Sequence, residues 1–301
     1  MNDDIGDPGP AGEPLGAPEA IEELHGSPEK APSRRSGRER RRSQFLNLHV
    51  SVKKAQDKWP ELAEGSALAE VRELWERGVL FPVALTKFAV MSERQRKRVL
   101  KSFLFFKEKF KTDGTLARLK ARLVANGAMQ KWMGGEDKSS PTVKIESVLM
   151  MLAIAASERR HMVAIDIGNA YLEADMSGEE VLMELDPFCV RLLLKIAPQL
   201  LPYVDSRGKM VCRLDKALYG CVQSAKLWYG KMKQTLLNLG FIQNDYDQCV
   251  FNKIIKGKQI TVGLYVDDLL VTCVDKVTIE RFISDLKMAF KEVKVSEYDK
   301  F

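Results

Sequence analysis

Apolar residues recur at regular intervals over the second half of the chain, and their spacing predicts a succession of helices and strands. The apolar runs at 162–167 and 181–185 are short enough to be buried strands. Residues 260–265 and 269–272 flank a short break and predict the two strands of a tight hairpin. Segments with apolar residues every three or four positions predict helices at 145–156, 224–239 and 279–290.

The pattern is weaker in the first half. Residues 67–75 have helical spacing, and residues 93–106 predict a basic helix or a helix that leads into a strand. Residues 117–125 alternate, which predicts a strand with Leu119, Ala121 and Leu123 on one face and Lys120, Arg122 and Val124 on the other. The element order favours an α+β fold, an antiparallel sheet covered by helices on one side.

Residues 1–43 lack the apolar content of a folded segment. They contain six of the twelve prolines, and residues 1–29 carry eight acidic residues without a single Lys or Arg. Such a segment cannot bury enough apolar surface to offset the entropy of ordering, so we predict a disordered tail. An arginine cluster follows the acidic part: Arg34, Arg35, Arg38, Arg40, Arg41 and Arg42. It is compatible with a nuclear-localisation or RNA-contacting patch, although a flexible linker is the simpler interpretation.

Composition narrows the function classes. The five cysteines are scattered without a C-x-x-C pair, which favours reduced thiols in an intracellular protein over a zinc site. Three histidines supply little for histidine-based catalysis, and neither a secretory signal nor a membrane span is visible. The net charge is +6, and residues 94–122 hold eleven Lys or Arg against Glu108 and Asp113. This stretch suits a polyanion such as nucleic acid, although a solvated surface has the same composition.

Three aspartates carry the candidate chemistry. Asp267 and Asp268 lie side by side between apolar strands, and Asp166 ends the apolar run 162–167. Adjacent buried carboxylates repel each other, and a divalent cation is the simplest way to neutralise them. If the two strands are neighbours in one sheet, the three carboxylates converge. Oxygen ligands without Cys or His favour Mg²⁺, and two such ions promote phosphoryl transfer. An ordinary Asp-containing turn is the alternative.

Five segments occur in the order found in one family, and together they resemble the copia-type retrotransposon reverse transcriptase. They are KARLVANGAMQ (120–130), SPTVKIES (140–147), DIGNAYLEADM (166–176), CRLDKALYGCVQSAKLWY (212–229) and LYVDDLLV (264–271). The resemblance implies polymerase fingers and palm over 103–301, after a poorly defined helical lead-in at 44–102. It also implies that thumb and RNase H regions are absent. One departure is at 221–225, where the family has a basic residue and a proline that this chain lacks.

The resemblance implies a role for each candidate residue. Asp166, Asp267 and Asp268 would be catalytic and would bind two Mg²⁺ ions, or Mn²⁺, with the carbonyl of Ile167. The deoxynucleoside triphosphate (dNTP) would contact Lys120, Arg122, Tyr171, Tyr219 and Gly220. Tyr171 would lie beneath the sugar, where a ring leaves no room for a 2′-hydroxyl. Gly220 would let a template or nucleotide approach the backbone.

The implied function is RNA-directed DNA synthesis on an RNA template with a DNA or RNA primer. Integrase and RNase H would be further parts of the same polyprotein. The implied location is cytoplasmic, in a virus-like particle, with a nuclear location left open. The alternatives are a catalytically decayed nucleic-acid-binding remnant, another palm-type enzyme such as a nucleotidyl cyclase, and a structural domain without activity.

Overall fold

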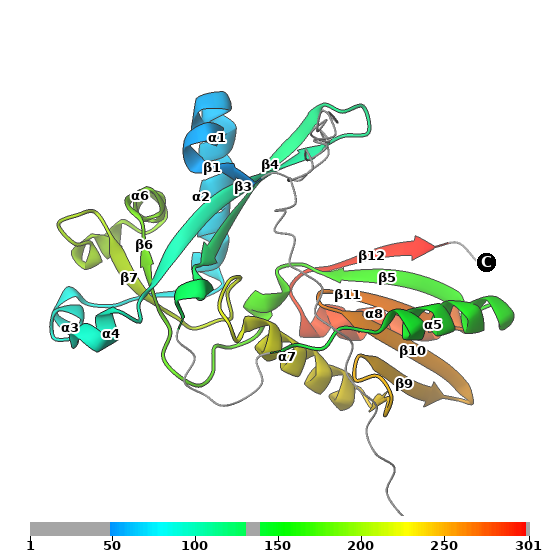
Figure 1. Cartoon of the computed structure of the whole chain (residues 1–301). Helices are drawn as coiled ribbons and strands as arrows, with labels where there is room; N and C mark the ends of the chain where they lie inside the picture. Colours follow the sequence, from blue (N-terminus) through cyan, green and yellow to red (C-terminus); the bar gives the residue numbers. More distant parts are fainter. Residues whose placement is uncertain (1–48, 131–138, 299–301) are drawn as a thin grey trace, which may run out of the picture. The chain divides into compact units, whose positions relative to one another are not determined.

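The computed structural model describes residues 49–130 and 139–298 (Figure 1). The predicted disordered tail, residues 1–43, lies outside the described residues. Two six-stranded sheets and the helices that pack on them make up the described part, which is a mixed fold of helices and sheets. None of the described helices is long and apolar enough to cross a membrane.

The first sheet has the order β1-β3-β6-β7-β2, with β4 paired to β3 beside this path. Its long hairpin, β3 with β4, pairs antiparallel from Ser102–Ala125 to Phe110–Leu116, and only β3 with β6 is parallel among the described strands. The strands are β1 (His49–Ser51), β2 (Leu80–Pro82), β3 (Leu100–Phe110), β4 (Leu116–Ala125), β6 (Leu182–Leu185) and β7 (Met210–Leu214).

Helices pack on this sheet through small and branched side chains. The small residues Ala63 and Ala67 on α2 are fully buried, which lets the helix approach β4 closely. Prolines at the first turn begin both α2 and α6, where a missing N–H costs nothing. The helices and 3₁₀ turns are α1 (Val52–Lys58), α2 (Pro60–Glu76), α3 (Leu85–Ala89), α4 (Glu93–Arg96), η1 (Gly127–Met129), α6 (Pro187–Ile196) and η3 (Pro198–Tyr203).

The second sheet is antiparallel throughout its described strands, in the order β12-β5-β11-β10-β9-β8. Alternate residues of its central strands, such as Ile165, Val262 and Val271, are fully buried beneath helices α7 and α8. The strands are β5 (His161–Ile167), β8 (Ile242–Gln243), β9 (Val250–Ile255), β10 (Lys258–Tyr265), β11 (Asp268–Cys273) and β12 (Val293–Tyr298).

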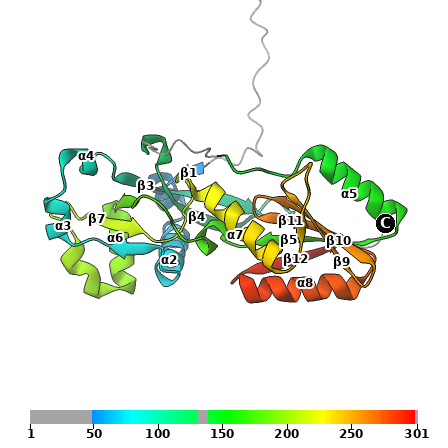
Figure 2. The same ribbon diagram turned by 90° about the horizontal axis from the view of Figure 1, so that it is seen from below.

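Helix α5 (Ile145–Ser157) lies on the opposite side of this sheet from α8 (Lys276–Ala289), as Figure 2 shows. Met151 of α5 approaches Gly263 of β10, on the face away from α7 (Ser224–Asn238). The prediction that helices cover one side is therefore wrong for α5. The helix is apolar on nearly every side, so its pattern did not reveal which face is buried: Met151 and Ala155 are buried, while Ile145 and Leu149 are exposed.

Most predicted elements are confirmed. The helix predicted at 224–239 is α7, followed by Gly240 at φ +83°, and the hairpin predicted at 260–272 is β10 with β11. The helix-to-strand segment predicted at 93–106 is α4 followed by β3. Strand β12 and helix α6 were not among the predicted elements, since the alternation of β12 and the apolar pattern of α6 extend over only six and ten residues.

Candidate active site

Backbone pairing brings two of the three predicted aspartates together. Strand β5 lies next to β11, and Asp166 is the direct cross-strand partner of Asp268. On its other side β5 pairs with β12, where Lys294 lies opposite Asp166. Tyr265 lies opposite Asp268 on β10. These four residues form a row across neighbouring strands, which we call the carboxylate row. Opposing residues of antiparallel strands share one face, so the condition for convergence is met for Asp166 and Asp268.

The carboxylate row faces away from α7 and α8 and lies on the face of the second sheet on which α5 packs through Met151 and Gly263. Ile165 and Leu269, each next to an aspartate in sequence, are buried under α7 and α8. Since successive side chains of a strand point to opposite faces, Asp166 and Asp268 occupy the other face. The side chain of Asp166 is 45% exposed. An apolar layer thus fixes the strands, while the carboxylates remain accessible.

The third aspartate lies in the hairpin turn. The amide of Ile167 donates to the backbone oxygen of Asp267 at 2.9 Å, so the turn is tied to the end of β5. Val266 has φ +56°, a left-handed conformation that is strained for a β-branched residue. The buried indole of Trp228, on α7, donates to the carbonyl oxygen of Val266 at 2.6 Å. This bond holds the strained turn in place.

Like charge accumulates in this corner. Burial, and then the neighbouring charges of Asp267 and Asp166, raise the pKa of Asp268. Lys294 Nζ lies 3.7 Å from Asp166 Oδ2 and also forms an ion pair with Glu292, which raises the pKa of Lys294. A lysine ammonium beside Asp166 marks this as a place where a cation is stabilised.

The donor set fits a hard divalent cation. The three aspartates offer oxygen atoms, and no Cys or His is among the residues that line the cleft described below. Within residues 49–130 and 139–298, however, no three His, Cys, Asp or Glu side chains are drawn together closely enough to enclose a metal ion. Asp166, Asp267 and Asp268 are the residues that would hold such an ion.

The two basic residues predicted on one strand face lie across the cleft. Lys120 and Arg122 both lie on β4, and burial lowers the pKa of Lys120, as do the charges of Arg122 and Arg118. Arg122 Nη1 is 3.5 Å from Glu70 Oε2, and its guanidinium lies 5.6 Å from the ring centre of Tyr219. The alternation therefore predicted the shared face of β4, although it did not predict Glu70.

Two tyrosines pack against each other between the basic strand and the aspartates. The rings of Tyr171, in η2 (Ala170–Glu173), and Tyr219 have centroids 4.4 Å apart. Burial, with the charge of Asp267, raises the pKa of Tyr171, and raises that of Tyr219 to about 12. Both phenols thus remain protonated at neutral pH.

Gly220 permits a close approach within the protein itself. It has φ +91°, and a Cβ added there would lie 2.0 Å from the backbone oxygen of Ala125. A Cβ on Gly127 would meet the Gly220 oxygen at 1.8 Å. The amide of Ala125 donates to the Tyr219 oxygen at 2.9 Å. Glycine at 220 therefore lets the segment with Tyr219 lie against the end of β4.

These residues surround one cleft of about 640 Å³. Six of the nine predicted site residues line it: Lys120, Arg122, Asp166, Ile167, Tyr219 and Asp267. Tyr171, Gly220 and Asp268 lie beside the lining without forming part of it. The cleft thus has basic residues on one wall and carboxylates on the other.

The cleft also contains residues that the sequence did not reveal. Glu70 and Glu73 come from α2, Glu292 immediately precedes β12, and Lys294 lies at the start of β12. Alternation of Val293, Val295 and polar residues is a short strand signal that predicts the exposed face of Lys294. Glu70 has no such signal, because acidic residues on the polar side of a helix are common.

Comparison with known families gives one match over most of the chain. A sequence profile described as "Reverse transcriptase (RNA-dependent DNA polymerase)" matches residues 86–301. The match includes the candidate residues of β4 and the carboxylate row, and begins after α2.

Individual relatives agree with the profile. The chain is 33% identical over 188 residues to the retrovirus-related Pol polyprotein from transposon RE2 of Arabidopsis thaliana. This alignment covers 62% of the chain and 12% of that polyprotein. The chain is also 32% identical over 219 residues to the transposon Ty1-GR3 Gag-Pol polyprotein of Saccharomyces cerevisiae. That alignment covers 71% of the chain and 11% of the polyprotein. A crystal structure of prototype foamy virus protease-reverse transcriptase aligns with a TM-score of 0.33 and 12% identity, over 73% of this chain and 21% of that one.

Proposed function

Because the chain belongs to the reverse transcriptase (RNA-dependent DNA polymerase) family, we propose that it forms the catalytic core of a copia-type retrotransposon Pol polyprotein. In this proposal the first sheet and α2 are the fingers, and the second sheet with α5, α7 and α8 is the palm. The chain spans about an eighth of the curated relatives it matches, so the remaining polyprotein parts, including integrase and RNase H, would be its covalent partners.

The observation that carries the proposal is the carboxylate row, in which backbone register sets Asp166 opposite Asp268 beside the Asp267 turn. Two bound Mg²⁺ ions would activate a primer 3′-hydroxyl and stabilise the leaving pyrophosphate. The aspartates would hold these ions with the Ile167 carbonyl. Because the buried layer beneath the row fixes the strands, the carboxylates would need little reorganisation during the reaction.

The opposite wall of the cleft supplies positive charge for a dNTP. Lys120 and Arg122 would contact its triphosphate, and a guanidinium offers two parallel N–H donors to phosphate oxygens. Tyr171 would limit the space at the 2′ position, with its ring packed against that of Tyr219. Gly220 would act by placing Tyr219 against β4. An RNA template and its primer would lie along the end of the second sheet that bears the carboxylate row, and the site of action would be intracellular.

Primer extension on a primed RNA template tests the proposal. The 301-residue chain should extend the primer with dNTPs and Mg²⁺, and Asp267→Asn should remove the product while its circular dichroism spectrum stays unchanged. Asp245→Asn is the matched control, because Asp245 is an exposed carboxylate in the loop between β8 and β9, and it should extend normally.

Three outcomes are distinguishable. Loss of product in Asp267→Asn alone supports the enzyme. Equal extension by Asp267→Asn and wild type would remove the proposed mechanism. A wild-type chain that binds primer-template in a mobility-shift assay but extends nothing would identify a nucleic-acid-binding remnant, which the basic residues at 94–122 would also support.

A further inference from the structure

Helix α2 lies along the open edge of β4. In the described part of the chain β4 pairs with β3 alone, so one row of its backbone groups has no strand partner. Ser66 Oγ donates to the Leu119 oxygen at 2.9 Å and accepts from the Ala121 amide at 2.8 Å. One turn later, the Glu70 carboxylate accepts from the Leu123 amide at 3.2 Å. Two side chains of α2 therefore replace a neighbouring strand.

Glu70 also holds the guanidinium that faces the cleft. Its second carboxylate oxygen lies 3.5 Å from Arg122 Nη1, and the two side chains are 16% and 21% exposed. Burial raises the pKa of Glu70, an effect that Arg122 and the Leu123 amide oppose. Contact through Nη1 alone leaves the other donors of Arg122 available.

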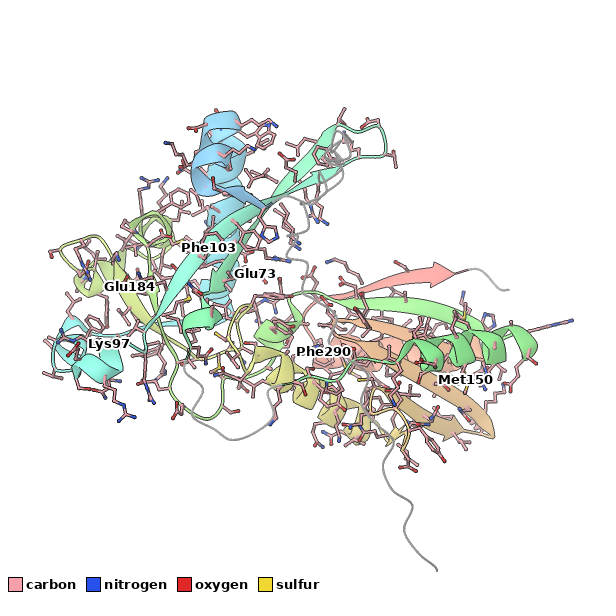
Figure 3. The ribbon with its side chains drawn as sticks, in the orientation of Figure 1. Glu73, Lys97, Phe103, Met150, Glu184 and Phe290 are labelled. Atoms are coloured by element: carbon pink, nitrogen blue, oxygen red, sulfur yellow. The ribbon has the colours of Figure 1, made fainter. Side chains whose placement is uncertain are left out.

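The helix that carries Glu70 is itself anchored at its C-terminal end. Arg77, whose side chain is 9% exposed, donates to Glu173 at 2.7 Å and pairs with Glu73. Asn169 Nδ2 donates to Glu73 at 3.4 Å, and both Asn169 and Glu173 follow β5, the strand of Asp166. Figure 3 labels Glu73 on α2. This anchoring limits how far Glu70 can shift relative to the second sheet.

We propose that Glu70 is a positioning residue for nucleotide binding, which holds the plane of Arg122 in the orientation that receives the triphosphate. The inference rests on the proposed function and extends it to α2, which precedes the matched residues 86–301. A long arginine side chain loses rotamer freedom when it binds phosphate, and a partner that fixes it beforehand removes part of this cost. Glu70 therefore assists binding more than the chemical step.

Steady-state kinetics of primer extension test the proposal through Glu70→Gln. The glutamine oxygen can still accept from the Leu123 amide, while the charge opposite Arg122 is lost. We expect the KM for dNTP to rise about 3- to 10-fold and kcat to change by less than about twofold, as expected when substrate binding is weakened. Glu76→Gln on the same helix is the control, because Glu76 is 60% exposed and pairs only loosely with Arg72, at 3.9 Å.

A double-mutant cycle separates positioning from a general structural effect. With Arg122→Gln already present, Glu70→Gln should raise the KM by less than about twofold more, since its partner is gone. Equal effects in both backgrounds, an unchanged KM in the single variant, or a lowered KM would overturn the proposal. A lowered KM would mean that Glu70 competes with the triphosphate for Arg122.

Two further results keep the test decisive. If Glu70→Gln does not fold, Glu70→Asp retains the charge but withdraws it by one methylene, and its KM should rise about two- to threefold. An unchanged KM in a folded Glu70→Asp would then contradict the proposal. Absence of extension by the wild-type chain would count against the proposed function, whereas normal extension by every Glu70 variant would count against this inference alone.

Discussion

The carboxylate row lies on one wall of the cleft. The other wall contains the contact between Arg122 of β4 and Glu70 of α2, which we call the β4–α2 corner. The two place charged side chains by different means. In the row, Lys294, Asp166 and Asp268 are neighbours because their strands pair in register. In the corner, Arg122 is held by Glu70, a residue 52 positions earlier on a different element. Main-chain pairing repeats over every residue of a strand, whereas the corner depends on single side-chain contacts. The row should therefore tolerate neighbouring substitutions better than the corner does.

The strongest contrast between the two walls should appear in kcat. Asp166→Asn removes a charge that the proposed metal ions require, and we expect kcat to fall about a thousandfold or more, similar to losing a main electrostatic stabiliser. The KM for dNTP should change much less. Steady-state primer extension at varied dNTP concentration measures both. A decrease confined to KM would place Asp166 in substrate binding and erase the distinction between the walls.

Arg122→Gln tests the other wall. Loss of one bidentate phosphate contact should raise the KM for dNTP about 10- to 100-fold, with a smaller effect on kcat. Arg72→Gln, a change at an exposed arginine of α2 outside the cleft lining, should have little effect. The two walls would be functionally alike if Arg122→Gln reduced kcat by as much as Asp166→Asn does.

Tyr171 lies beside the cleft, packed against Tyr219. Tyr171→Ala should leave extension with dNTPs largely intact and increase the use of ribonucleotides about tenfold or more, because the space at the 2′ position is enlarged. Competition between a dNTP and the matching ribonucleotide measures this ratio. Unchanged sugar discrimination would assign the selection to another residue.

The aspartates of the row could be predicted from the sequence because the strands that carry them have a periodic pattern. Apolar runs that end in Asp166 and flank Asp267 and Asp268 specify buried strands, and the resemblance to copia-type reverse transcriptases, which the family match confirms, supplied the order of the segments. Alternation predicted that Lys120 and Arg122 share a strand face, and the resemblance supplied the role proposed for them. Periodicity fixes which face a residue occupies, and this was sufficient to place both residues on one face.

The remaining contributors depend on tertiary contacts that periodicity does not encode. Glu70 is one acidic residue among several on α2, and only the approach of the helix to β4 gives it a partner. Lys294 lies on a short strand whose pairing with β5 is long-range. Gly220 was expected to face a ligand, but its contact is with the backbone of Ala125. Each of these three residues acts through a contact with a segment that is distant in the sequence, and a local pattern does not reveal such a contact.

Strain is a further difference between the walls, because Val266 has φ +56° in the turn of the row. Val266→Gly should increase the free energy of unfolding by about 0.5–1 kcal/mol. The relief of about 1–2 kcal/mol of strain exceeds the entropy cost of glycine, roughly 0.5–1 kcal/mol. The bond from Trp228 is retained because it reaches the backbone oxygen. Urea denaturation measures the change, and a less stable variant would show that the valine side chain contributes more than its strain costs.

The smallest effect concerns the charge of Asp268, whose pKa is raised by burial and by Asp267 and Asp166. A raised carboxyl pKa means that ionisation is less favourable in the folded than in the unfolded chain. This loss of folding free energy is absent below the pKa of Asp268 in the unfolded chain and fully present above its raised pKa in the folded chain. Asp268→Asn should therefore raise the melting temperature at neutral pH by about 1 °C, a small shift because the group is partly solvated. At about pH 3 the difference in melting temperature should vanish, because the Asp268 carboxyl is then protonated in both the folded and the unfolded chain. The same variant should lose primer extension, so stability and activity would change in opposite directions. A lower melting temperature at neutral pH would show that Asp268 is held by favourable contacts, and the row would then resemble the β4–α2 corner.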